Sequence, residues 1–170
     1  MFNINSKRRE FAAVVRAYSA ELYRYAYWLS RDRFIAEDLV QETFSRAWTS
    51  WGTLRDTRAQ KNWLYTILRH EHARLFERKR FDFVADQDLD ALEDPRIRTV
   101  SLNFELQDVL HDLPTAYREP LLLQVLGGFN CDEIATIMNL TVGATMTRLS
   151  RARSALRKAT GRRNANEATG

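Results

Sequence analysis

The chain has 170 residues, a net charge of +4 and an apolar content of 45%, which suits either one globular domain or two small ones with buried cores. Its single cysteine excludes an internal disulfide, no apolar run approaches transmembrane length, and the first ten residues are too polar for a signal peptide. We therefore expect a cytoplasmic protein with no membrane insertion of its own.

Charge is distributed unevenly along the chain. Residues 1–80 hold 16 Lys and Arg against 9 Asp and Glu, residues 81–100 hold 2 against 6, and residues 101–170 hold 8 against 7. Two basic blocks separated by an acidic one favour two surfaces that contact nucleic acid. The alternative is that charge simply drifts along a soluble helical protein.

The first eighty residues predict three helices. Apolar side chains recur every three or four positions from residue 11 to 29, from 35 to 51 and from 57 to 80. Asp32 can cap the second helix, and we expect Gly52 to end it in a left-handed cap. Sustained alternation of period two is absent from the sequence, so no sheet is expected.

The acidic segment that follows breaks this pattern. It contains Pro95 and loses the helical period, which predicts an at least partly flexible linker. Helices resume at Leu102, pause at Pro114 and stop again at Gly127, while the end of the chain is polar and expected to be disordered. The sequence therefore predicts an all-α protein of two small helical domains, the second with four helices; the first domain, linker, second domain and tail are expected at 1–81, 82–101, 102–160 and 161–170.

The second domain carries the pattern of a helix-turn-helix between Asn130 and Lys158. Asn130 and Glu133 have the spacing of a capping box, Asn139 suits a turn, and Thr141 can cap the next helix. Inward-facing positions of that next helix are expected at Val142, Leu149, Ala152 and Leu156. Its other faces carry side chains that can reach base edges or phosphates, namely Thr147, Arg148, Ser150 and Arg151. A helical hairpin with a solvated basic face is the alternative interpretation.

The second predicted helix has a polar cluster formed by Glu37, Asp38, Gln41 and Glu42. Asp38 and Glu42 are like charges four residues apart, which mildly destabilises an isolated helix and is tolerable if a basic partner binds there. A solvated acidic face near a helix N-terminus is the alternative.

The third predicted helix mixes aromatic and basic side chains, a composition typical of surfaces that bind unpaired bases. The aromatic side chains are Trp63, Tyr65 and Phe76, and the basic ones include Arg69, Arg74 and Arg78. Trp63 also fits the apolar stripe, so a purely structural role for it stays open.

Enzymatic and metal-binding functions find little support. His70 and His72 flank Glu71 but point to different faces of a helix, and the sequence contains no phosphate-binding loop or nucleophile elbow. We expect no enzyme, no metal and no cofactor. Cys131 lies in the first turn of a predicted helix, where either a redox role or a plain small residue is possible.

Three segments, in this order, resemble the extracytoplasmic-function sigma factors of bacterial RNA polymerase. AEDLVQETFSRAW (36–48) is similar to the family's polymerase-binding helix, and WLYTILR (63–69) resembles the start of its promoter-melting segment. LPTAYREPLLL (113–123), followed by DEIA and VGATMTRLSRAR, resembles its C-terminal domain. The resemblance covers roughly residues 8–160.

The resemblance implies a subunit that reads promoters while polymerase does the chemistry. The acidic cluster would bind the clamp of the polymerase β′ subunit, and the linker would pass through the RNA-exit region. The melted −10 strand would contact Trp63, Arg69, His70, Arg74 and Arg78. The −35 duplex would contact Met146, Thr147, Arg148, Ser150 and Arg151. An anti-sigma factor that hides these surfaces is also implied.

The chain departs from the family pattern at several of these positions. Met146 stands where a cation is usual and Thr145 where valine is usual, so we expect an altered −35 preference and slightly looser packing. His70 stands where asparagine is common and Arg74 where aspartate is frequent, which alters the −10 contacts. Two other interpretations stay open, a dimeric helix-turn-helix regulator and a sigma-like decoy that binds a regulator protein.

Overall fold

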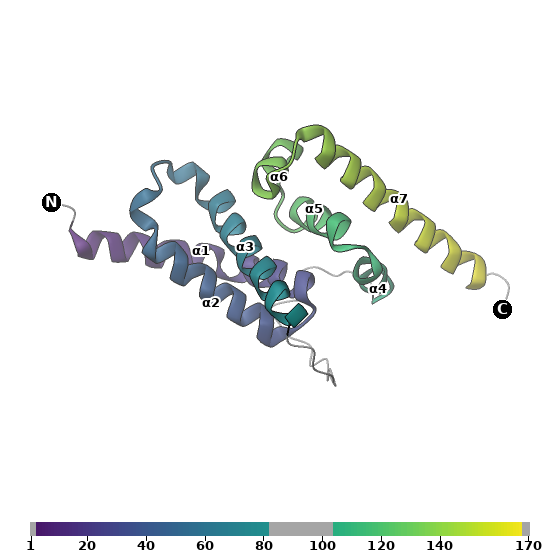
Figure 1. The fold of residues 1–170 in the computed structure, drawn as a ribbon, viewed down its shortest axis with the longest axis horizontal. Coiled ribbons are helices and arrows are strands. Elements are labelled where there is room, and N and C mark those ends of the chain that lie inside the picture. Colours follow the sequence, from purple (N-terminus) through teal and green to yellow (C-terminus); the bar gives the residue numbers. More distant parts are fainter. Residues whose placement is uncertain (1–2, 82–103, 168–170) are drawn as a thin grey trace. The chain divides into compact units, whose positions relative to one another are not determined.

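The structure is a computed structural model that describes residues 3–81 and 104–167. The chain divides into two compact units, with the division between residues 96 and 97. Every regular element in the described ranges is helical, which confirms the predicted all-α class and the two-domain organisation (Figure 1). The predicted linker, residues 82–101, lies outside the described residues.

The first unit packs three long helices. They are α1 (Ile4–Ser30), α2 (Arg33–Thr49) and α3 (Gln60–Phe81), with two short 3-10 turns, η1 (Trp51–Thr53) and η2 (Thr57–Ala59), between the last two helices. Helix α2 contacts both α1 and α3, so all three helices share one core (Figure 1). Fully buried side chains of that core include Leu22, Tyr25, Leu29, Leu64, Tyr65 and Leu68.

A buried tyrosine joins α3 to α1. The Tyr65 hydroxyl donates a hydrogen bond to Glu21 Oε1 at 2.8 Å, and Lys61 Nζ lies 2.9 Å from the same oxygen. Burial, reinforced by the Glu21 carboxylate, raises the pKa of the Tyr65 phenol. The phenol therefore stays protonated and donates, while Glu21 is held between a phenol and an ammonium group.

The start of α2 follows the prediction, but its end does not. Asp32 Oδ1 accepts hydrogen bonds from the backbone N–H groups of Phe34 and Ile35 at 2.8 and 3.0 Å, as expected of an N-cap. The expected left-handed cap at Gly52 is wrong, because α2 already ends at Thr49 and Gly52 lies inside η1 with no positive φ. Tertiary packing explains the difference: η1 places the Trp51 ring 5.2 Å from Phe11 and 6.2 Å from Trp63, measured between ring centroids.

The second unit has four helices within its described residues, as predicted. They are α4 (Phe104–Asp112), α5 (Thr115–Val125), α6 (Cys131–Met138) and α7 (Val142–Glu167). Helix α7 packs on the other three, and the core between them includes Leu122, Leu123, Ile134, Ile137, Leu149 and Ala152.

The turn between α5 and α6 requires two glycines for different reasons. Gly128 has φ +68°, in the left-handed region that favours glycine. Gly127 has an ordinary φ, but a Cβ atom there would lie 2.6 Å from two ring carbons of Phe129 and 2.7 Å from the Leu123 carbonyl oxygen. The ring of Phe129 is itself buried, so the turn has no room for a side chain at Gly127.

Helix α7 extends past the expected start of a disordered tail. The prediction of disorder from residue 161 is wrong for residues 161–167, which continue the helix, while 168–170 lie outside the described residues. The segment contains no proline, and one internal glycine costs a helix only about 1 kcal/mol, so a polar composition alone does not end it.

Candidate nucleic-acid interface

The helix-turn-helix of the second unit is closed by the caps that its sequence predicts. The Asn130 side chain accepts from the Glu133 N–H at 2.9 Å, and the Glu133 carboxylate accepts from the Asn130 N–H at 2.8 Å. Asn139 ends α6 in the left-handed region with φ +53°, and Thr141 Oγ1 accepts from the Ala144 N–H at 3.1 Å to start α7. The turn therefore fixes where α7 begins.

The outward face of α7 holds most of the residues predicted to bind the −35 duplex. Met146, Thr147, Ser150 and Arg151 are exposed and Arg148 is half-buried, whereas Leu149 and Ala152 are buried beneath them. The expectation that Val142 faces inward is wrong, because Val142 is 42% exposed. Thr145, which is fully buried, occupies the inward position of that turn instead.

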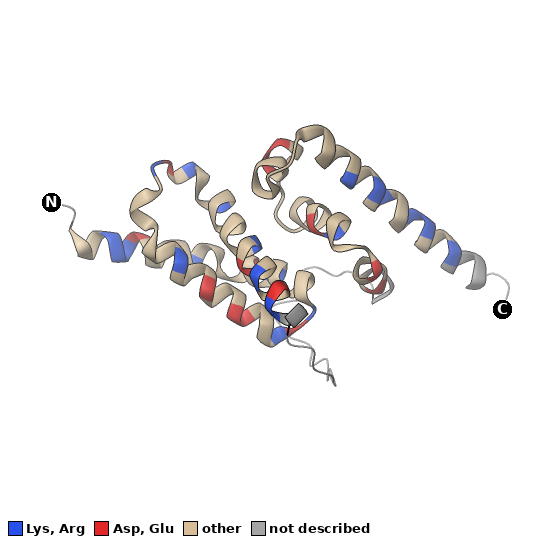
Figure 2. Cartoon of the chain, viewed as in Figure 1, with Lys and Arg blue, Asp and Glu red and all other residues tan. Residues whose placement is uncertain are grey.

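Two residues of α5 contact the basic side chains of α7. Arg151 Nη1 lies 3.4 Å from the Tyr117 hydroxyl, and Arg153 Nη2 donates to Gln124 Oε1 at 2.5 Å. These contacts join residues 34 and 29 positions apart, so no local pattern in the sequence predicts them. They orient two guanidinium groups that flank the buried Ala152, in the part of α7 where basic residues follow one another (Figure 2).

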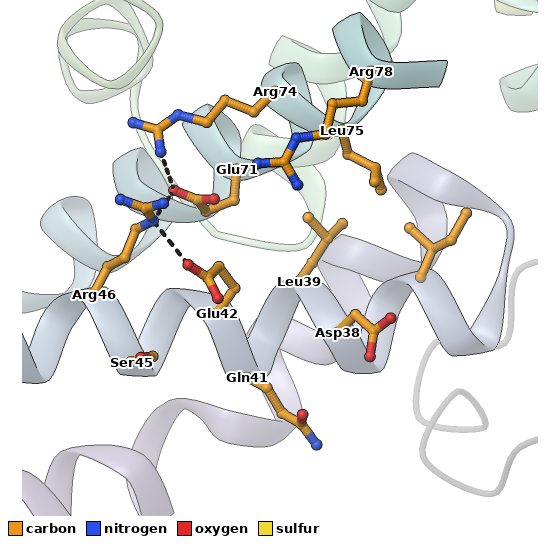
Figure 3. Close-up of a pocket in the computed structure, with 11 residues that line it drawn as sticks. Asp38, Leu39, Gln41, Glu42, Ser45, Arg46, Glu71, Arg74, Leu75 and Arg78 are labelled. Atoms are coloured by element: carbon orange, nitrogen blue, oxygen red, sulfur yellow. Dashed lines mark ion pairs between the residues drawn. The ribbon is translucent and has the colours of Figure 1, made fainter. Parts of the chain in front are cut away.

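In the first unit, the residues of the acidic cluster follow one another along α2, where Figure 2 shows the acidic segments in red. Asp38, Gln41 and Glu42 are exposed, whereas Glu37 is half-buried and its carboxylate lies 3.6 Å from Arg33 Nε. The three exposed residues line a groove of about 650 Å³ between α2 and α3, together with Ile35, Leu39, Ser45, Arg46, Glu71, Arg74, Leu75 and Arg78 (Figure 3). Both helices thus contribute charge of both signs: α2 provides Asp38, Glu42 and Arg46, and α3 provides Glu71, Arg74 and Arg78.

A chain of four charged side chains crosses this groove (Figure 3). Arg46 Nε lies 3.0 Å from Glu42 Oε1 and also contacts Glu71 Oε1, and Arg74 Nη1 lies 3.5 Å from that same Glu71 oxygen. Glu71 is 8% exposed, so the central carboxylate is buried while both ends of the chain reach solvent. Because Arg46 Nε faces two carboxylates and Glu71 Oε1 faces two guanidinium groups, the contacts at each shared atom compete with each other.

A smaller hollow of about 260 Å³ brings together three of the residues predicted to contact the −10 strand. Trp63, His70 and Arg74 line it, together with Arg46, Thr49, Ser50, Ile67 and Glu71. Arg78 lines the larger groove instead, and Arg69 lines neither of these two cavities. An indole, an imidazole and a guanidinium around one hollow can stack on a base and pair with a phosphate.

One aromatic residue of α3 differs from the sequence interpretation, and another lies outside the hollow. Tyr65 is fully buried in the core, so its ring cannot stack on a base as proposed from the aromatic composition. Phe76 is 44% exposed and lies 4.5 Å from the His72 ring, measured between centroids. Only Trp63 of the three predicted platforms therefore borders the hollow.

The described residues contain no group of three side chains placed to hold a metal ion, and no helix of theirs is long and apolar enough to cross a membrane. The Cys131 thiol is half-buried, with Sγ 3.9 Å from the Val142 carbonyl oxygen. That contact joins the first residue of α6 to the first residue of α7. A redox role for Cys131 stays a prediction.

A helix-turn-helix unit and a separate three-helix unit with a basic, aromatic hollow define a two-domain helical DNA-binding protein. Comparison with known families narrows this class. The Sigma-70 region 2 model matches residues 14–81, and the Sigma-70 region 4 model matches residues 103–156. The chain belongs to the extracytoplasmic-function sigma factors of RNA polymerase, a family of transcription initiation factors without catalytic activity.

Relatives and solved structures agree with this assignment. The chain is 34% identical over 139 residues to the sigma factor EcfG of Rhodopseudomonas palustris, covering 79% of this chain and 76% of that protein. It is 29% identical to SigW of Bacillus subtilis, with 87% of each chain covered. The co-crystal structure of the sigma factor RpoE with the anti-sigma factor NepR from Bartonella quintana matches with a TM-score of 0.72 and 29% identity, over 91% of this chain and 96% of that one.

Proposed function

We propose that this sigma factor recruits core RNA polymerase through α2, captures the melted −10 strand at the smaller hollow, and reads the −35 duplex with α7. The observation that carries the proposal is the convergence of Trp63, His70 and Arg74 on one hollow beside an acidic helix face. The protein would act in the cytoplasm, with polymerase supplying all the chemistry.

The acidic face of α2 is suited to a basic partner. Asp38, Gln41 and Glu42 are exposed on consecutive turns, and the like charges of Asp38 and Glu42 favour an external cation between them. We propose that this face binds the clamp of the β′ subunit. Glu37 should contribute less to that binding, because its carboxylate already pairs with Arg33. The smaller hollow adjoins this face, since Arg46, Glu71 and Arg74 line both cavities.

The hollow is suited to a single strand because it combines stacking with positive charge. The Trp63 ring offers a π-face, and base stacking on such a ring contributes about 1–3 kcal/mol per base. His70 and Arg74 replace residues that the family pattern favours, so the bases selected here are expected to differ. Arg69 and Arg78 would follow the backbone outside the hollow.

The second unit is suited to duplex DNA. A recognition helix places its N-terminal residues against base edges in the major groove, and Thr147, Ser150 and Arg151 lie on the exposed face of α7. Arg148, half-buried, reaches the rim of that face. We also propose that an anti-sigma factor holds the chain inactive, since a solved relative with 29% identity is a complex of that kind.

Run-off transcription with purified core polymerase and a library of promoters tests the proposal. Specific initiation that depends on this protein is the expected result. Arg151→Ala should lower promoter affinity and leave polymerase binding intact, while Arg157→Ala, further along the same helix, should have a smaller effect. Equal loss of DNA and polymerase binding by Arg151→Ala would mean that the substitution unfolds the domain.

The polymerase-binding face needs its own variant. Asp38→Arg combined with Gln41→Ala should abolish binding to core polymerase while circular dichroism and DNA binding stay unchanged. Glu10→Arg is the matched control, because it also reverses an exposed carboxylate but lies on α1, outside the groove. Normal transcription by the double variant would remove the assignment of this face, and stable core binding without initiation by the wild type would favour a decoy.

A further inference from the structure

The N-terminal tip of α7 presents an apolar patch to solvent. Val142 is 42% exposed and Met146 is 59% exposed, and their four-residue spacing places them one above the other on successive turns. The other large apolar side chains that are exposed in the described residues, Ile4, Phe34, Phe76 and Val125, lie on other helices. We call Val142 and Met146 the apolar tip.

The apolar tip belongs to the face of α7 that is turned away from the core. Exposure along the helix repeats at helical spacing, with Met146, Thr147, Ser150 and Arg151 outside and Thr145 and Leu149 inside. Val142 opens this exposed side, one turn before Met146. Both side chains therefore continue the surface that would face the major groove.

Charge separates this tip from the rest of the helix. Residues 142–147 contain no charged side chain, and the basic residues begin at Arg148 (Figure 2). Of the two acidic side chains of α6, Glu133 is held in the capping box with Asn130. A surface of methyl and thioether groups beside arginines is suited to bases at its tip and to phosphates further along.

Among the four bases, one presents an apolar group in the major groove. Thymine carries a C5-methyl group there, whereas the other bases present only hydrogen-bond donors and acceptors. Exposed valine and methionine side chains cannot use those polar groups, but they gain by excluding water from a methyl group. The methionine chain is also flexible enough to follow a methyl whose exact position differs between promoters.

We propose that Val142 and Met146 determine −35 specificity by contacting the C5-methyl groups of thymine. The inference rests on the proposed function of α7 and adds the class of base that it selects.

Replacement of thymine by deoxyuridine tests the proposal, because it removes the methyl group and leaves base pairing intact. Full-length protein with core polymerase is bound to a promoter taken from the run-off selection, in which each −35 thymine is replaced in turn. Burial of one methyl group is equivalent to roughly fourfold in affinity, so we expect one or two positions with a loss of about that size.

Protein variants distinguish the apolar tip from its surroundings. The double variant Val142→Ala with Met146→Ala should bind thymine and deoxyuridine promoters equally, whereas Met146→Leu should keep the discrimination because it keeps the apolar volume. Arg151→Ala should weaken binding to both promoters by the same factor. Circular dichroism shows whether each variant remains folded.

The outcomes separate this inference from the function on which it rests. Failure of the wild type to bind any −35 element would overturn the proposed function itself. Specific binding that is indifferent to deoxyuridine at every −35 thymine would overturn only the role of the apolar tip. Discrimination that persists in the double variant Val142→Ala with Met146→Ala would overturn the assignment to these side chains, and a core-polymerase affinity that falls in the same variant would assign the tip to a protein contact.

Discussion

Glu71 is the residue whose replacement tests the charged chain of the first unit most directly. Glu71→Gln keeps the shape of the side chain and removes the carboxylate that Arg46 and Arg74 share. Both guanidinium groups then lose their buried acidic partner, while Arg46 keeps its 3.0 Å contact with Glu42. We expect Arg74 to turn toward the smaller hollow, which it already lines.

The expected loss of stability is small. Glu71 itself is 8% exposed, but the Arg46 and Arg74 side chains are 43% and 51% exposed, so solvent screens both pairs. Exposed ion pairs contribute about 0–1 kcal/mol each, and the neutral amide is easier to desolvate than the carboxylate. The free energy of unfolding should therefore fall by about 1 kcal/mol, measured by urea denaturation of the full chain.

The effect on DNA binding should be of similar size and of the opposite sign. One freed guanidinium that contacts a phosphate raises affinity for a single strand and makes the dependence of log K on log salt steeper by about 0.7. We expect a gain of roughly threefold to tenfold at low salt, since one charge-assisted hydrogen bond contributes about 1.5–3 kcal/mol before the cost of ordering the side chain. Fluorescence anisotropy with a labelled −10 single strand, in the presence of core polymerase, measures both quantities.

Glu77→Gln is the matched control, because it makes the same change of charge on the same helix without lining either cavity. The reasoning is refuted if Glu71→Gln weakens strand binding while the fold is retained. It is equally refuted if both variants change the salt dependence by the same amount, since the effect would then come from net charge and not from the released arginine.

Three further substitutions test packing and capping. Thr145→Val should raise the free energy of unfolding by about 0.5–1 kcal/mol. The reason is that the buried hydroxyl donates only to the Thr141 carbonyl, which already accepts the Thr145 backbone N–H at 3.0 Å. An unchanged or lowered denaturation midpoint would contradict this prediction. Asn130→Ala should cost about 1 kcal/mol by opening the capping box, seen as a lower thermal midpoint of the second unit without change in the first. Tyr65→Phe should cost about 1 kcal/mol by removing the 2.8 Å hydrogen bond to Glu21, and a neutral result in urea denaturation would show that this bond contributes nothing net.

Local signals in the sequence predict the helices and most of their ends. Asp32, Asn130 and Thr141 act as caps because each accepts hydrogen bonds from backbone groups two or three residues away, which is information that the sequence contains. Gly52 was mispredicted since the path of η1 depends on where the Trp51 ring packs, and its partner Phe11 is 40 residues distant. Propensity is a weak guide wherever aromatic packing decides the backbone.

The candidate sites divide in the same way. Residues of one helix face, such as Thr147 and Arg151, follow from periodicity. The contact of Arg46 with Glu71 and that of Arg151 with Tyr117 join different helices. Residue spacing within one helix therefore does not predict them. Val142 was expected to be buried because helical periodicity does not show where along α7 the packing against its neighbours begins. The position of α6 determines which residues of α7 are covered.

The crowded turn at Gly127 has a consequence for genetic screens. Any side chain there must push aside the Phe129 ring or the Leu123 carbonyl, which lie on the path from α5 to α6. A screen for loss of promoter recognition should therefore recover changes at Gly127 alongside those at Arg151, although Gly127 lies in the turn before α6 and has no side chain to offer DNA. Thermal melting will distinguish the two groups of mutants. Changes at Gly127 should lower the melting temperature because they displace the helix-turn-helix, whereas changes at Arg151 should leave it unchanged because they remove only a DNA contact.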